Sequence, residues 1–282
     1  MSFLDHIRAC NAHDLSGFRP FELEGHRLGW VRHALAEQLP GVDPGFVVTA
    51  DRVTLVPEVR DFEARSSVLA HAAQFLVETG AVTALRGEFY PVMPSWGAEP
   101  LMRIDRAAVA QFGISAYGLH VNGFVRQPDG GLSLWVGRRA RDREVAPGKL
   151  DNLIAGGQPI GLTLAENLVK EAQEEAGIDA ALASRAVPVG AVTYRMETEA
   201  GLKQDTLFLY DLELDADFVP RNSDGEVERF ELWPLDRVVE SVRETTDWKF
   251  NVPLVVIDFL VRHGRLTPEE PDYLEIVKGL RR

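Results

Sequence analysis

The sequence is poor in cysteine and in positive charge, and it has no long hydrophobic run. Its single cysteine, Cys10, excludes an intramolecular disulfide and favours a reducing compartment; we expect it on the apolar face of a first helix. The N-terminus lacks the pattern of a signal peptide. The most apolar segment, residues 252–261, is too short to cross a bilayer and contains Asp258, which favours a buried helix. We therefore expect a cytoplasmic protein without a membrane partner.

Basic residues are too few for a nucleic-acid-binding protein. The chain has 30 Lys and Arg against 43 Asp and Glu, a formal net charge of −13. Nucleic acids are bound mainly through Lys and Arg, so we expect no nucleic-acid partner. The acidity also restricts any phosphate-bearing ligand. An anion approaches a cluster of glutamates only where a metal ion reverses the local potential.

The pattern of hydrophobic residues predicts two α/β domains in a chain of 282 residues. Residues 1–112 form the smaller mixed α/β domain, with a helix over residues 61–78. Residues 113–282 form the second domain, which begins with a hairpin around the turn at Pro128–Gly131. The predicted strands are residues 46–49, 53–56, 88–92, 119–126, 132–138, 188–194, 206–214 and 229–234, followed by a final helix between Asn251 and Gly264. This order fits an α/β/α sandwich around a mixed sheet.

The most informative segment is a glycine-rich turn from Gly156 that leads into an acidic helix. Thr163 and Glu166 have the spacing of a capping box, and Gly177 marks the end of the helix. The helix carries three glutamates within about 100° of arc on one face, where like charges repel. These are Glu171, Glu174 and Glu175. A solvent-exposed acidic face is one interpretation. The other is a site for a hard divalent cation such as Mg²⁺, which binds carboxylates together with substrate phosphates.

The helix resembles the second half of the Nudix box. Residues 170–178 read Lys-Glu-Ala-Gln-Glu-Glu-Ala-Gly-Ile, with Lys170 in the place of the usual arginine. The first half departs from the family pattern, because Leu162 stands where a glutamate is expected when the box is counted from Gly156. That glutamate usually braces the loop, and we expect the capping residue Glu166 to take over this role.

Four further segments resemble one Nudix subfamily of plants and fungi, in which a domain of unknown function precedes the hydrolase. They are residues 86–92, 118–125, 134–139 and 148–157. The resemblance implies a Nudix α/β/α sandwich with a mixed sheet, preceded by the smaller α/β domain. The implied activity removes one phosphate from thiamine diphosphate, preferentially from its damaged oxo and oxy forms.

Hydrolysis of a phosphoric anhydride needs a metal-neutralised electrophile and an activated water. We expect Glu174 and Glu175 as metal ligands and Glu171 as a ligand or as the general base. Mg²⁺ is the expected cofactor, with Mn²⁺ as the alternative. The resemblance implies further roles: an ion pair from Lys170 that orients a glutamate, a backbone carbonyl near Gly156 on the metal, and a loop acid. A solvent-facing Lys170 is the alternative to the ion pair. The candidates for the loop acid are Glu226 and Glu228.

Residues outside the box are candidates for binding a small-molecule diphosphate. We expect Arg138 or Arg139 to reach a phosphate through its guanidinium fork and the other to point to solvent. Three aromatic residues could stack on a substrate ring, with buried packing as the alternative for each. These are Trp96, Trp135 and Tyr194. We expect His120, inside a strand, to be structural.

Three other hypotheses bear on function. The protein could be a Nudix pyrophosphatase of nucleoside diphosphate derivatives such as ADP-sugars, because the box fixes the chemistry and the loops fix the substrate. Isopentenyl diphosphate isomerase shares the fold, but its catalytic cysteine has no counterpart here. A non-catalytic ligand sensor tends to lose the box glutamates, and this chain keeps three. The N-terminal domain could cover the cleft or form a homodimer.

Overall fold

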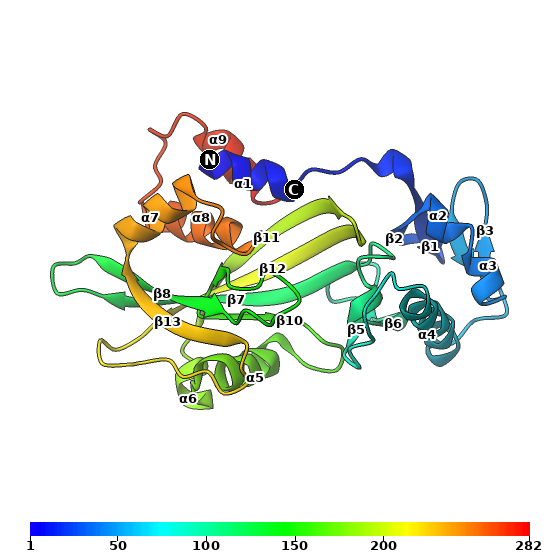
Figure 1. The fold of residues 1–282 in the computed structure, drawn as a ribbon, viewed down its shortest axis with the longest axis horizontal. Coiled ribbons are helices and arrows are strands. Elements are labelled where there is room, and N and C mark those ends of the chain that lie inside the picture. The colour runs from blue at the N-terminus through cyan, green and yellow to red at the C-terminus, as the bar shows by residue number, and fades with distance from the viewer.

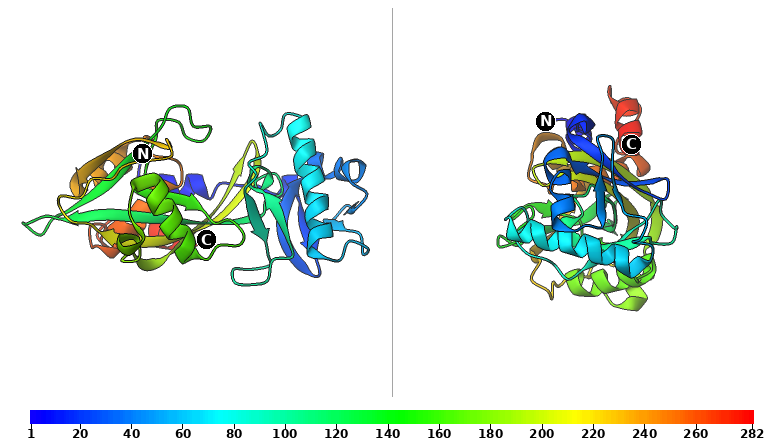
Figure 2. Two further views of the ribbon diagram at one scale, coloured as in Figure 1. Left: turned by 90° about the horizontal axis from the view of Figure 1, so that it is seen from below. Right: turned by 90° about the vertical axis from the view of Figure 1, so that its right-hand side faces the viewer.

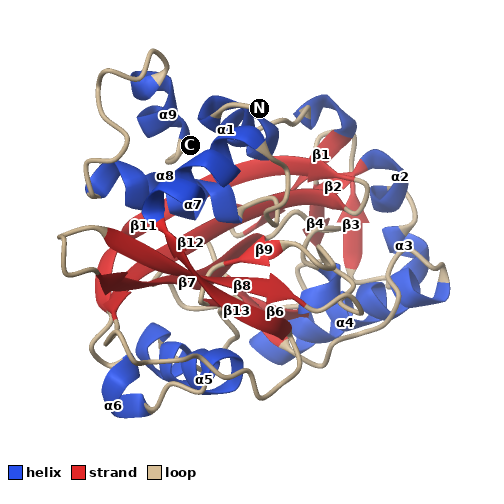
Figure 3. Ribbon diagram, turned by 60° about the vertical axis from the view of Figure 1, so that its left-hand side comes forward, coloured by secondary structure: helices blue, strands red, loops and turns tan.

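The computed structural model describes residues 1–282 and contains the predicted α/β/α sandwich (Figures 1 and 3). Its seven-stranded sheet has the spatial order β11 (Val187–Thr198), β12 (Gly201–Glu213), β7 (Ser115–Arg126), β8 (Leu132–Arg139) and β13 (Val227–Pro234), with β10 (Ile154–Gly157) paired to β7 and β9 (Leu150–Asp151) paired to β8. The sheet is mixed because β12 runs parallel to β7 while the other pairs are antiparallel. The mixed sheet is therefore confirmed.

Helices cover both faces of this sheet (Figure 3). On one face, α5 (Leu164–Ala176) buries Leu168 and Ala172 against Leu119 and Ile154. On the other face, the core is built around α8 (Val252–Arg262), in which Val252 to Leu260 are all buried. Apart from Asp258 and Arg262, which pair with each other, α8 is apolar, so the sequence pattern correctly predicts a buried helix. No helix of the structure is both long and apolar enough to span a bilayer.

The β7–β8 hairpin forms where the turn residues predict it. Gly130 has φ +86°, a left-handed conformation that glycine adopts without strain, and the Gly131 amide donates to the Asp129 side chain. Strands β7 and β12 begin several residues before the predicted ranges, and β11 ends several residues after its predicted range. These additional residues pair with one another across the three neighbouring strands.

The N-terminal unit has its own sheet and core. The sheet order is β2 (His26–Arg32), β1 (Phe18–Leu23), β4 (Val53–Leu55) and β3 (Phe46–Val48). The predicted helix is α4 (Phe62–Glu78), which Asp61 caps by accepting from the Ala64 amide. A separate hairpin of β5 (Phe89–Val92) and β6 (Met102–Asp105) packs against α4. Leu69, Met102 and Phe112 lie in this core.

The first helix does not belong to the unit that its sequence position suggests. In α1 (Phe3–Cys10), Phe3, Leu4 and Ile7 are buried in the core around α8, and Figure 1 shows α1 beside the C-terminal helix α9 (Tyr273–Gly279). Helix α1 therefore packs with the second sheet although it lies within residues 1–112, and the boundary at residue 112 stays a prediction. Its apolar face does carry Cys10, which is 1% exposed and donates to the Phe250 carbonyl, as expected.

Short helices complete the chain. They are α2 (His33–Ala36), α3 (Leu39–Val42), α6 (Ala180–Ala183), α7 (Leu235–Glu244) and the 3₁₀ turns Leu15–Gly17 and Arg106–Ala108.

The two units are joined by hydrogen bonds and an ion pair as well as by the chain. The Leu202 amide donates to the Ala110 carbonyl, and Arg32 forms a 2.9 Å ion pair with Glu197. Figure 2 shows the N-terminal unit at one end of the long strands β7 and β12.

Candidate active site

Helix α5 begins and ends where the sequence predicts. Thr163 and Glu166 form the reciprocal capping box, and Gly177 closes the helix at φ +64°. Glu166 binds both the amide and the hydroxyl of Thr163 through Oε2, at 2.8 Å each. It therefore braces the start of the helix.

Of the three box glutamates, Glu171 and Glu175 lie against β10. Glu171 and Glu175 are buried, whereas the Glu174 side chain is 46% exposed. The Oε2 atom of Glu175 accepts from the Ala155 amide at 2.8 Å. Lys170 Nζ lies 3.0 Å from Glu171 Oε1 and 2.9 Å from Glu174 Oε2. Lys170 therefore forms the ion pairs that the resemblance implies.

Glycine is required in β10 because the backbone is in close contact on both faces. A Cβ on Gly156 would lie 2.5 Å from Cγ and 2.7 Å from Oε2 of Glu171. A Cβ on Gly157, whose face is opposite, would overlap the hydroxyl of Tyr90. Gly156 thus allows the Glu171 carboxylate to lie against the strand, which is the contribution of the glycine turn to the site.

The backbone carbonyl that faces the glutamates comes from the residue before Gly156. In an antiparallel ladder the N–H and C=O of one residue point to the same side. Because the Ala155 amide points to Glu175, the Ala155 carbonyl lies on that free edge of β10. The Gly156 carbonyl instead lies on the β7 side, 2.9 Å from the position of a Cβ on Gly118.

Burial makes the glutamate charges costly. It raises the pKa of Glu175 well above its ordinary value, and the carboxylates of Glu171, Asp151 and Glu226 raise it further, against the Ala155 amide that lowers it. Burial also raises the pKa of Glu171, although Lys170 lowers it. Desolvation lowers the pKa of Lys170, but its bonds to Glu174 and Glu171 outweigh this effect and raise it overall. The cluster therefore has more negative charge than one lysine balances.

The two candidate loop acids have different partners. Glu226 pairs with Arg143, and after burial its charge is one of those that raise the pKa of Glu175. The register of β13 shifts between Val227 and Arg229, so a bulge breaks the alternation that would put both acids on one face. Glu228 instead pairs with Arg229 at 2.9 Å.

The arginines after the Leu-Trp-Val-Gly strand are both engaged by the protein. Arg139 is buried and binds Asp151 Oδ2 at 3.0 Å, so the expectation that one of the pair points to solvent is wrong for this residue. Arg138 donates to the Gly148 carbonyl at 2.9 Å, and its Nε is buried without a partner. Lys249 also binds Asp151, at 3.3 Å. The charge of Arg139, a candidate for binding substrate phosphate, is thus paired with the buried carboxylate of Asp151.

The three aromatic candidates have different environments. Trp96 is 44% exposed and packs on Tyr117 and Phe208, with ring centroids 4.7 and 4.6 Å away. Trp135 is buried in the core beneath α5. Tyr194 is 2% exposed on the α8 face, and its hydroxyl donates to Asp205. Only Trp96 therefore presents a ring to solvent.

Tyr117 and Phe208 complete an aromatic surface that sequence reasoning missed. They come from neighbouring strands, and their proximity follows from the parallel pairing of β7 with β12. No short-range pattern reveals this pairing. Tyr117 is next to the glycine turn, because its carbonyl accepts from the Gln158 amide at 2.8 Å.

His120 has the structural role expected of it. Its Nδ1 lies 2.8 Å from Asn152 Oδ1. Burial, followed by the charge of Lys249, lowers the pKa of His120 to about 4, so the ring is neutral at pH 7.

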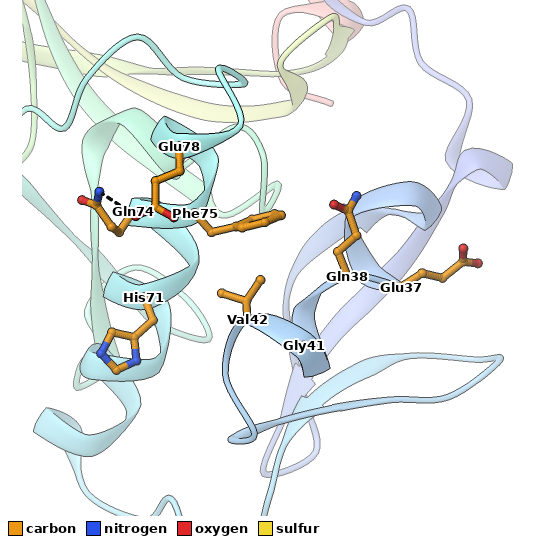
Figure 4. Close-up of a pocket in the computed structure, with 8 residues that line it drawn as sticks. All are labelled: Glu37, Gln38, Gly41, Val42, His71, Gln74, Phe75 and Glu78. Atoms are coloured by element: carbon orange, nitrogen blue, oxygen red, sulfur yellow. Dashed lines mark hydrogen bonds between the residues drawn. The ribbon is translucent and has the colours of Figure 1, made fainter.

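A separate hollow of about 770 Å³ lies in the N-terminal unit, away from these residues (Figure 4). It is lined by Glu37, Gln38, Gly41, Val42, His71, Gln74, Phe75 and Glu78. With two hydrophobic residues among eight and no free cation, it has neither the ligands nor the charge for phosphate chemistry.

Comparison with known proteins decides the family. A family model described as a NUDIX domain matches residues 116–254, and one described as a domain of unknown function (DUF4743) matches residues 2–116. Nudix hydrolase 24, chloroplastic, and Nudix hydrolase 20, chloroplastic, both of Arabidopsis thaliana, are 42% and 41% identical over 99% of this chain and 77% of each relative. The chain belongs to the Nudix hydrolases.

Two solved structures resemble part of this chain. A crystal structure of a Deinococcus radiodurans protein has a TM-score of 0.44 at 20% identity, covering 60% of this chain and 95% of that one. The MutT protein of Methanosarcina mazei has a TM-score of 0.37, also at 20% identity, covering 54% and 95%.

Nudix enzymes generally use divalent metals such as Mg²⁺ or Mn²⁺, and the residues of this Nudix hydrolase fit such an ion. No three carboxylate, histidine or cysteine side chains converge closely enough to hold a metal by themselves. Mg²⁺ does not need such a cage, because it is commonly held by one or two carboxylates, waters and substrate phosphates. Two buried glutamates with raised pKa values, balanced only by Lys170, form a donor set that a hard cation would stabilise.

Proposed function

We propose that this Nudix hydrolase is Mg²⁺-dependent and removes one phosphate from an organic diphosphate with an aromatic ring. Thiamine diphosphate and its oxidised forms are the leading substrates. The observation that carries the proposal is the buried pair Glu171 and Glu175 at the free edge of β10. The subfamily-like segments, including residues 86–92 and 148–157, support the choice of substrate.

The residues have distinct roles in this proposal. Glu174, Glu175 and the Ala155 carbonyl would hold the metal, together with substrate phosphate oxygens. When bound, Mg²⁺ would neutralise the diphosphate and lower the pKa of a coordinated water. Glu171, whose pKa burial raises, is suited to accept a proton from the attacking water. Lys170 pairs with Glu171 and Glu174 and would keep their carboxylates in position.

The aromatic surface offers a place for the ring of the substrate. The exposed Trp96 is fixed by Tyr117 and Phe208, so stacking on it costs little side-chain entropy. A stacked aromatic pair is worth about 0.5–1.5 kcal/mol beyond the area it buries. Trp96→Ala should therefore raise KM by roughly 3- to 10-fold with a smaller change in kcat.

Phosphate release from a panel of diphosphates with Mg²⁺ tests the proposal. The panel contains thiamine diphosphate, its oxidised analogues and nucleotide sugars. We expect thiamine monophosphate and inorganic phosphate in equal amounts, with the highest kcat/KM for the oxidised analogues. Preferential cleavage of a nucleotide sugar to two monophosphates would instead establish the pyrophosphatase alternative.

A further inference from the structure

The β5–β6 hairpin of the N-terminal unit lies against the glycine turn of the hydrolase (Figure 1). The Ile160 amide donates to the Phe89 carbonyl at 2.8 Å, and the Tyr90 side chain contacts Gly157. Glu144 of the hydrolase accepts from Thr83 at 3.0 Å and pairs with Arg86. Contacts on two sides therefore fix this hairpin beside β10.

The hairpin presents an ion pair between Glu88 and Arg106. Arg106 Nη1 donates to Glu88 Oε2 at 2.8 Å, and the Arg106 amide donates to the Glu88 carbonyl at 2.9 Å. Asp105 is 4% exposed and accepts from the amides of Arg86, Gly87 and Ala107 at 2.9–3.2 Å. The Asp105 carboxylate thus fixes the backbone next to Glu88 and next to Arg106.

The pair lies within electrostatic range of the glutamate cluster. Burial raises the pKa of Glu171, and the carboxylates of Glu174 and Glu88 raise it further. Desolvation lowers the pKa of Arg106, but Tyr90, Glu88 and Glu226 outweigh it and raise the pKa overall. The geometry agrees, since Glu88 precedes Phe89, whose carbonyl accepts from the Ile160 amide, and Tyr90 contacts Gly157, the neighbour of the glycine that lies against Glu171.

Arg106 has capacity left for a ligand. A guanidinium has five N–H donors, and the protein accepts from Arg106 through Glu88 alone. Its side chain is 55% exposed. Among the neighbouring cations, Lys170 pairs with both Glu171 and Glu174, and Arg139 is buried against Asp151. Arg143 also has one glutamate partner, Glu226, but its side chain is less exposed than that of Arg106.

We propose that Arg106, oriented by Glu88, binds a phosphate of the diphosphate substrate, so that the N-terminal unit supplies one wall of the active site. The inference rests on the proposed function in that the substrate is a diphosphate. A planar guanidinium matches two phosphate oxygens at once. In a chain of net charge −13, a fixed arginine beside the glutamates attracts the anion that those glutamates repel.

The first test compares Arg106→Gln with a matched control, Arg52→Gln. Arg52 is also on the N-terminal unit, its side chain is 56% exposed, and it also pairs with one glutamate, Glu22. Calorimetry would measure the binding of inorganic pyrophosphate in Mg²⁺. We expect R106Q to weaken binding roughly 10- to 100-fold, because a hydrogen bond to a charged group is lost, and R52Q to match the wild type. R106K, which keeps the charge but not the fork, should fall between them.

The second test asks whether Glu88 acts through Arg106. We expect E88Q to change pyrophosphate affinity in the wild-type background and to leave it unchanged in the R106Q background, which is the non-additivity of residues that act as a unit. Thermal unfolding separates binding from folding, since R106Q and R52Q should shift Tm equally. Wild-type pyrophosphate affinity in both R106Q and R106K would overturn the inference, whatever their Tm.

The two proposals fail in different ways. If thiamine diphosphate is not cleaved but pyrophosphate binding depends on Arg106, the substrate is wrong and this inference stands. If thiamine diphosphate is cleaved with wild-type KM by R106Q, the function stands and this inference is wrong.

Discussion

The hydroxyl of Tyr90 occupies the space that a side chain on Gly157 would need. A Cβ there would overlap Tyr90 Oη and lie 2.8 Å from Cζ. A residue of the N-terminal unit thus packs against the backbone that leads into the Nudix helix. The N-terminal unit and the hydrolase are therefore in direct contact beside the candidate active site.

Gly157→Ala should destabilise the protein by about 1–3 kcal/mol, the usual cost of overpacking. Neither group can move away easily, because Tyr90 is paired in the β5–β6 hairpin and Gly157 is paired with β7. Tyr90→Phe removes the atom in closest conflict. In denaturant unfolding, the double variant should be less destabilised than the sum of the single changes. Gly41→Ala, where a Cβ meets no atom within 4 Å, serves as the control and should be neutral or slightly stabilising. Strict additivity would contradict the contact.

His120 should make the fold sensitive to mild acid. Its pKa is about 4 in the folded state and about 6.5 when unfolded, so the unfolded chain binds the proton first and stability falls as pH drops through this window. Between pH 7 and 5 the loss from this group is about 2 kcal/mol. The buried glutamates have raised pKa values, so their contribution to the pH dependence of stability has the opposite sign. Both the wild type and H120Q contain them, so the difference between the two pH profiles reports on His120. H120Q should flatten the pH profile of unfolding, and H26Q, at an exposed histidine, should not.

Cys10 should react with thiol reagents only after unfolding. Burial raises the pKa of its thiol to about 12, and α1 seals it against the core around α8. We expect alkylation in native buffer to be slower than in denaturant by several orders of magnitude, because the thiolate is the reactive form. Rapid native alkylation would show that α1 detaches from the second unit.

The parts of the fold that depend on local sequence could be predicted. The capping box and Gly177 define α5, and the apolar run defines α8. The placement of α1 could not, because its apolar face fits either core and its partners in β11, α8 and α9 are far away in sequence. The fold class follows from the order of elements, whereas pairing between distant strands does not.

The candidate site divides in the same way. The three glutamates follow from helical spacing, and Lys170 from its position beside them. In a regular strand, Glu226 and Glu228 would lie on the same face, but a bulge in β13 breaks this alternation. Arg106 had no local signal, since its role depends on where a hairpin of the first unit meets the second.

Metal should stabilise the fold only while the buried glutamates are intact. Mg²⁺ at 10- to 100-fold excess over its Kd should add about 1.4–2.7 kcal/mol, seen as a higher Tm that EDTA reverses without unfolding the protein. E175Q should lose this shift. Without metal, E175Q should be at least as stable as the wild type at pH 8, because the raised pKa of Glu175 means that its charge opposes folding. An equal Mg²⁺ shift in both proteins would place the ion elsewhere.

The most direct measurement is phosphate release from thiamine diphosphate in Mg²⁺ by the wild type, E175Q and E166Q. All three have the same helix, since glutamine also serves in a capping box at Glu166. We predict turnover by the wild type, a loss of about 100-fold or more in kcat for E175Q, and a change of less than about 3-fold for E166Q. Equal turnover by E175Q and the wild type would contradict the account, as would a wild type that cleaves no diphosphate in Mg²⁺.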